Sequence, residues 1–150
     1  MNRKYALLSV ASLLALGLTM TSCNKNDNNP IVVGPDTYTA TINGASEKPA
    51  STTSTAVGSF VGRLNEATRT MSYTVTYSGM TPTGGHLHRV TNANGTGPVV
   101  FPFPNLTSPI IGTVTFANQA GMDSLKNGFY YANIHSAAFP GGEIRGDIKK

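Results

Sequence analysis

The strongest constraint on the fold is the alternation of apolar and polar residues over 70–79, TMSYTVTYSG. Met71, Tyr73, Val75 and Tyr77 fall on one side of an extended chain, and hydroxyl-bearing residues fall on the other. A period of two with β-branched and aromatic residues is typical of a strand that has one face against a core. We therefore predict a half-buried β-strand here.

Further segments share these features, and turn-forming residues separate nearly all of them. They are 37–44, 56–65, 84–90, 97–103, 110–116, 128–135 and 142–148. Asn43-Gly44, Asn94-Gly95 and Pro140-Gly141-Gly142 are examples of the intervening turn signals. About eight short strands at this spacing indicate an all-β fold. We expect an antiparallel Greek-key β-sandwich or barrel, with a superoxide-dismutase-like or immunoglobulin-like architecture.

One short helix is predicted near 118–127, within NQAGMDSLKNG. Asn118 is suited to cap its N-terminus and Gly128 to end it, while Met122 and Leu125 share one face. Gly121 lies inside the segment and costs about 1 kcal/mol relative to alanine. We therefore expect a helix of only about two turns, between two strands.

The N-terminus has the features of an export signal. Arg3 and Lys4 precede the uncharged stretch YALLSVASLLALGLTM, and the single cysteine, Cys23, follows it. The apolar run is short for a membrane-spanning helix, which needs about 20 residues. The sequence MTSC at 20–23 resembles a bacterial lipobox. Residues 1–22 are therefore predicted to be a lipoprotein signal peptide, and Cys23 to carry the lipid anchor, including palmitate.

The segment after the cysteine has the composition of a linker. Residues 23–36 are rich in asparagine and contain two prolines, so we predict a flexible tether there. The remaining residues, 37–150, have the usual size of one domain. Asn24 stands where an aspartate would favour retention at the inner membrane. We therefore expect an outer-membrane lipoprotein of the cell envelope, facing the periplasm or the cell surface.

The charge of the chain argues against nucleic acid as a partner. The formal net charge is +4, and removal of Arg3 and Lys4 with the signal lowers it to about +2. Only 12% of residues are charged, and no basic stripe remains. The expected partners are the membrane, through the lipid anchor, and a protein or glycan that the sequence does not identify.

Several motifs follow one another in the order NGASEKPAS, VGRL, YSGM, HLH, GPVV, GFYYANIHS and PGGEIRGDI. This order resembles that of the chordin-type (CHRD) domain family. The resemblance covers about 38–148, and its most specific part is the Asn-Ile-His strand end followed by Pro-Gly-Gly and Gly-Glu-Ile-Arg-Gly. This resemblance implies a β-fold and, among bacterial members, a secreted or lipid-anchored single domain. It implies no particular reaction.

All three histidines of the chain lie in these motifs. In the strand over 84–90, Leu87 is the apolar residue, so His86 and His88 are expected on the opposite, outer face, about 7 Å apart. The Pro-Gly-Gly turn makes 128–135 and 142–148 a predicted hairpin.

If Ile134 pairs with Ile144 in this hairpin, His135 lies opposite Glu143 and Asn133 lies opposite Arg145. Should the two histidine-bearing strands be neighbours, one outer face would collect the three histidines together with a supporting polar cluster of Asn133, Glu143 and Arg145.

Three interpretations of this face remain open at the level of sequence. The histidines can be structural surface residues beside a Glu143–Arg145 ion pair, and the domain a non-catalytic binding or structural module. They can instead form a copper or zinc site, since three neutral imidazoles suit either metal. A redox or hydrolytic enzyme is a distant alternative, because no Ser-His-Asp set, paired carboxylates or phosphate loop was found, and no catalytic residue is assigned.

Overall fold

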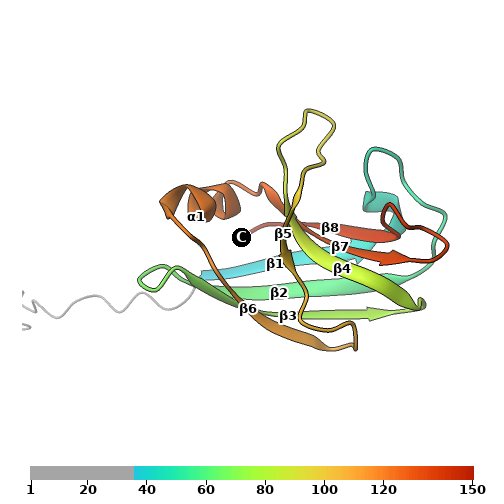
Figure 1. Cartoon of the computed structure of the whole chain (residues 1–150), viewed down its shortest axis with the longest axis horizontal. Helices are drawn as coiled ribbons and strands as arrows, with labels where there is room; N and C mark the ends of the chain where they lie inside the picture. Colours follow the sequence, from blue (N-terminus) through green and yellow to red (C-terminus); the bar gives the residue numbers. More distant parts are fainter. Residues whose placement is uncertain (1–35) are drawn as a thin grey trace, which may run out of the picture. The chain divides into compact units, whose positions relative to one another are not determined.

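The computed structural model describes residues 36–150, which form one antiparallel sheet of eight strands and one short α-helix (Figure 1). The strands are β1 (Asp36–Asn43), β2 (Val57–Asn65), β3 (Thr70–Ser78), β4 (Pro82–Arg89), β5 (Val99–Pro102), β6 (Ile110–Thr115), β7 (Tyr130–Ser136) and β8 (Ile144–Ile148). A 3-10 turn, η1 (Gly44–Ser46), follows β1, and the helix is α1 (Gln119–Lys126). The predicted signal peptide, Cys23 and all but the last residue of the predicted tether lie outside the described residues.

The sheet curls into a nearly closed barrel, with strand order β5-β4-β7-β8-β1-β2-β3-β6. Hairpins join β1, β2 and β3, whereas β6 returns to pair with β3, and β7 pairs with β4. Such mixing of hairpins with long crossover connections is the expected Greek-key pattern. The all-β prediction is therefore confirmed, in the barrel form.

The apolar face of every long strand lines the inside of the barrel. Tyr73, Val75, Leu87, Ile134 and Ile144 are all buried, as the alternation predicted. The largest fully buried apolar side chains include Tyr38, Phe60, Leu64, Met71 and Ile110, which come from β1, β2, β3 and β6. Strands distant in the chain thus share one core.

The helix forms where the sequence predicted it. The Asn118 side chain accepts a hydrogen bond from the Gly121 N–H at 3.1 Å and caps the N-terminus. Met122 and Leu125 are buried in the barrel core. Gly128 lies just past the helix with φ of 73°, a left-handed conformation that glycine adopts without strain. Within residues 36–150, no helix is long and apolar enough to cross a membrane.

The outer face of β4, β7 and β8 differs from the expected exposed surface, because two loops cover it. Thr52, in the loop after η1, donates to the Glu143 carbonyl at 2.8 Å. Gly95, in the β4–β5 loop, accepts from Arg145 at 2.7 Å. Asn133, Glu143 and Arg145 are consequently buried, with only 1% of Arg145 exposed. The polar cluster lies under loops and not on open surface.

Candidate metal site

The three histidines come from two neighbouring strands. His86 and His88 lie on β4, and His135 lies on β7. The β4–β7 register pairs His86 with Asn133 and His88 with Tyr131, and it places His135 opposite Gly84. Because Leu87 points into the core, both β4 histidines point to the opposite face, as predicted. The adjacency of the two strands, which the prediction had to assume, is confirmed.

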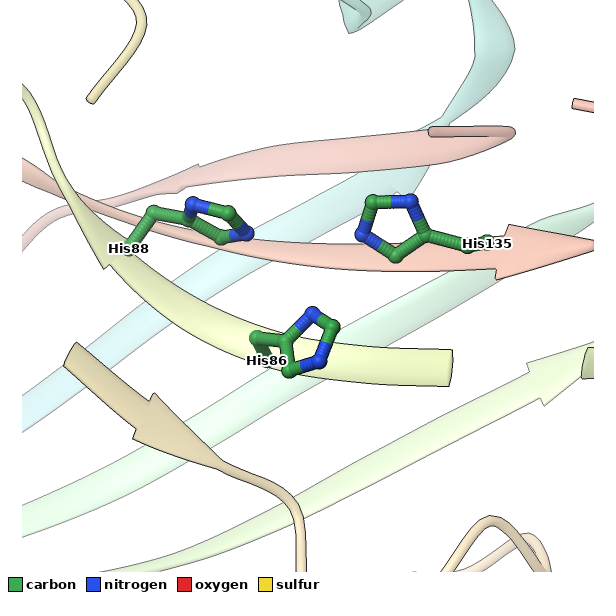
Figure 2. Close-up of side chains that lie close together, drawn as sticks. All are labelled: His86, His88 and His135. Carbon is green, nitrogen blue, oxygen red and sulfur yellow. The ribbon is translucent and has the colours of Figure 1, made fainter. Parts of the chain in front are cut away.

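The three imidazole rings converge on one point in front of the sheet (Figure 2). Each ring offers one nitrogen, and these nitrogens all lie within 4.8 Å of one another. The ring centroids are 5.2 Å apart for His86 and His135, 5.6 Å for His86 and His88, and 6.3 Å for His88 and His135. The sequence prediction that these residues gather on one face is therefore correct.

Two of the rings are oriented by backbone carbonyls. His88 Nδ1 lies 3.0 Å from the Gly97 oxygen, and His135 Nδ1 lies 3.0 Å from the Pro140 oxygen. A carbonyl oxygen can only accept, so each Nδ1 carries the proton and donates it. In a neutral ring, the lone pair then resides on Nε2. A hydrogen bond of this kind, from the other ring nitrogen, is what orients metal-ligating histidines.

A buried nitrogen of each ring has no hydrogen-bond partner among the described residues. These atoms are His86 Nδ1, His88 Nε2 and His135 Nε2, and each exposes less than 1 Å² to solvent. Unpaired buried polar atoms are rare in folded proteins, and each one calls for a physical explanation. Here three occur in one cluster.

Burial disfavours protonation of two of the rings. It lowers the pKa of His86 below the usual histidine value, and the nearby His135 lowers it further. Burial also lowers the pKa of His88, where the bond to the Gly97 carbonyl acts in the opposite direction and the charges of His86, His135 and Arg145 reinforce the decrease. Both rings therefore favour the neutral state, in which a nitrogen lone pair is available.

Tyr131 and Arg145 support the back of the His88 ring. The His88 and Tyr131 rings stack with centroids 4.7 Å apart and 8° between their planes. The Arg145 guanidinium carbon lies 3.5 Å from the Tyr131 ring centroid, within the range of a cation–π contact. Arg145 is held in turn by Asp147 Oδ1 at 2.8 Å. These contacts restrict the rotation of His88.

Comparison with known protein families identifies the domain type of the chain. The family model described as CHRD domain matches residues 38–148. The chain belongs to the CHRD domain family. No curated protein and no solved structure gives a significant match. The matched region contains the whole histidine cluster, so the cluster is part of this CHRD domain and not an addition to it.

The carboxylates of Glu143 and Asp147 bind partners other than the histidines. Ser54 donates to the Glu143 carboxylate at 2.6 Å, and among residues 36–150 no ion pair joins Glu143 to His135 or to Arg145. The predicted Glu143–Arg145 pair is therefore wrong, because Arg145 turns toward Asp147. Asn133 does lie opposite Arg145, as predicted.

Sequence reasoning missed several residues of this face. The buried Glu47 accepts a hydrogen bond from the Asn133 amide, and burial raises the pKa of its carboxyl group. Gly97 and Tyr131 contact His88. Alternation could have found Tyr131, since it lies two residues from Asn133 on the same strand. Glu47 and Gly97 are in loops, where no periodic signal exists.

Proposed function

We propose that this CHRD domain is a non-catalytic metal-binding module that holds one copper or zinc ion through His86, His88 and His135. The observation that carries the proposal is the convergence of three buried, unpaired ring nitrogens. Imidazole nitrogen is a preferred donor for both metals.

The energetic argument favours an ion over an empty polar cluster. A buried polar group without a partner costs about 1–3 kcal/mol, and the domain holds three such nitrogens side by side. A single metal ion would give all three a partner. Metal–nitrogen bonds of about 2.0–2.1 Å require donor nitrogens roughly 3.3–3.6 Å apart. Small side-chain rotations close the present spacing of at most 4.8 Å.

The structural interpretation of the histidines explains less. Hydrogen bonding to nearby loops would account for the Nδ1 atoms of His88 and His135, which bond to the backbone carbonyls of Gly97 and Pro140. It leaves without a role the three ring nitrogens that point toward one another, His86 Nδ1, His88 Nε2 and His135 Nε2. A metal ion accounts for both sets, because the carbonyl bonds place the Nε2 lone pairs toward the ion.

Titration of the purified, metal-free full chain with zinc and copper tests this proposal. We expect one equivalent of metal to bind, and the His86→Ala and His135→Ala variants to lose at least 100-fold in affinity. Glu143→Gln is the matched control, because its carboxylate bonds to Ser54 and not to a histidine. Equal affinity of the wild-type chain and the double variant His86→Ala/His135→Ala would contradict the proposal.

We further propose that the domain is attached to the cell envelope, as an outer-membrane lipoprotein anchored through Cys23. The basic start, the apolar stretch and the MTSC sequence at 20–23 support this. Two acyl chains give stable attachment where one is marginal. Cys23→Ala should abolish incorporation of labelled palmitate and release the protein from the membrane fraction. Retention of that variant in membranes would refute the anchor.

A further inference from the structure

The coordination number of the proposed site follows from what surrounds it. The group of potential ligand residues contains three histidines and, among residues 36–150, no carboxylate or cysteine joins them. The nearby acidic side chains are already engaged: Glu47 with Asn133, Glu143 with Ser54, and Asp147 with Arg145 and Lys48. Within residues 36–150, the histidine, cysteine and carboxylate side chains therefore supply three donors and no fourth.

Solvent has little access to the point on which the three nitrogens converge in this conformation. A water molecule in contact with a ring nitrogen has its centre about 3 Å away. A water bound to a tetrahedral ion would lie roughly 3.3 Å from each of the three donor nitrogens. Each nitrogen exposes less than 1 Å², so the three nitrogens offer almost no surface at which a water molecule from bulk solvent could make contact.

The donors are also held against rearrangement. His88 is fixed by the Gly97 carbonyl on one side and by the stacked Tyr131 ring on another. His135 is fixed by the Pro140 carbonyl. His86 alone makes no hydrogen bond through its ring within the described part of the chain, so it is the ring that can move inward to complete the site.

We infer that the site is three-coordinate and selects monovalent copper, Cu(I), over zinc. Zinc in proteins is almost always four-coordinate, and divalent copper prefers four or more donors in a tetragonal arrangement. Monovalent copper is stable with three nitrogen donors in a plane, whereas zinc, which also has a filled d shell, usually takes a fourth ligand. The inference rests on the proposed metal-binding function and adds the identity and oxidation state of the ion.

The test compares the two ions on the same protein. Metal-free full chain is titrated without oxygen against a chromophoric chelator loaded with Cu(I), and in parallel against a zinc chelator. We expect the Kd for Cu(I) to be at least 1000-fold lower than the Kd for zinc. X-ray absorption of the Cu(I)-loaded chain should show three nitrogen neighbours at about 2.0 Å and no oxygen neighbour.

A variant that supplies a carboxylate tests the selectivity directly. His86→Asp replaces a half-buried ring with a harder oxygen donor at the side of the site that is least fixed. We expect it to reduce the preference for Cu(I) over zinc at least 10-fold. Glu143→Gln, which leaves the histidines intact, should keep the wild-type preference.

The outcomes separate the two proposals. Tight zinc binding equal to or stronger than Cu(I) binding, or a fourth light neighbour in the Cu(I) spectrum, would overturn the three-coordinate inference and leave the metal-binding function standing. If neither ion binds more tightly to the wild-type chain than to the double variant His86→Ala/His135→Ala, both fall together. The absorption measurement needs no variant, so a folding defect in His86→Asp does not weaken the test.

Discussion

The Gly97 carbonyl accepts a hydrogen bond from His88 Nδ1 at 3.0 Å, and this bond connects the β4–β5 loop to the histidine cluster. The same carbonyl lies 3.3 Å from the Tyr131 hydroxyl. One loop residue thus orients a proposed ligand and the ring that stacks on it. The position has no side chain for a steric reason, since a Cβ on Gly97 would lie 1.8 Å from the Arg89 oxygen.

Gly97→Ala should therefore weaken metal binding without altering any histidine. The added methyl group collides with backbone, so the loop must shift and the bond to His88 is lost. Loss of the hydrogen-bond partner of a metal-ligating histidine typically reduces metal affinity about 10–100-fold. Isothermal titration with Cu(I) or zinc measures the effect. Gly141→Ala is the control, because its Cβ meets nothing within 4 Å, and an equal loss in both variants would contradict the argument.

Tyr131 offers a separate test of how His88 is held. Tyr131→Phe keeps the ring stack and the guanidinium contact and removes only the long bonds to Gly97, so we expect a change below about 1 kcal/mol. Tyr131→Leu removes the aromatic ring from between His88 and Arg145. It should cost about 1–3 kcal/mol of unfolding free energy and lower metal affinity about 10-fold. Urea denaturation and metal titration should distinguish the two variants. Identical results would show that the stacked His88 and Tyr131 rings contribute neither to stability nor to metal affinity.

A third prediction concerns the barrel core. The Ile134 side chain is completely buried in the barrel core. Ile134→Ala should therefore cost about 2–5 kcal/mol of unfolding free energy. Ile111, on the edge strand β6, is 67% exposed. Ile111→Ala should change stability by less than about 0.5 kcal/mol. Chemical denaturation of both variants measures the contrast, and equal costs would mean that the inside and outside faces are wrongly assigned.

Most of the barrel could be predicted because alternation is a local property. A side-chain period of two identifies the buried face of each strand, and the Pro-Gly-Gly turn sets the register that pairs Ile134 with Ile144. The histidine face followed from Leu87 and Ile134 alone. The strand order did not, because periodicity within a strand says nothing about which strand lies beside it.

The covering of the histidine face could not be predicted, because it depends on contacts between distant loops. The sequence of β7 alternates apolar and polar residues, which predicts one exposed face. Residues on both faces are nevertheless buried, because the loops carrying Thr52 and Gly95 pack over the outer side. The partner of Arg145 was within reach of sequence reasoning. Asp147 lies two residues further on the same strand and therefore on the same face. The alternation of β8 could not place Glu143, because this residue precedes the first residue of the strand.

The last prediction is the pH dependence of the metal-free domain. Folding lowers the pKa of both His86 and His88 below the unfolded value near 6.5, so the unfolded chain binds more protons as the pH falls through that value. Stability is then fully present above about pH 6.5 and decreases toward the lower folded pKa values. The groups that act on His88 are its own burial, the Gly97 carbonyl, and the charges of His86, His135 and Arg145.

We therefore expect His86 and His88 to lower the stability of the metal-free domain at pH 5.5 relative to pH 7.5, since the unfolded-state pKa of histidine lies between these values. The raised pKa of the buried Glu47 carboxyl group acts in the opposite direction. Urea denaturation at both values measures the difference. His88→Gln removes the most strongly buried of the three rings and should flatten the dependence, whereas Ile111→Ala should leave its slope unchanged. A metal ion competes with protons for the same nitrogens, so saturating Cu(I) should raise stability most at neutral pH and progressively less as the pH falls. A pH dependence that is the same in His88→Gln as in the wild-type domain would show that burial does not govern this ring.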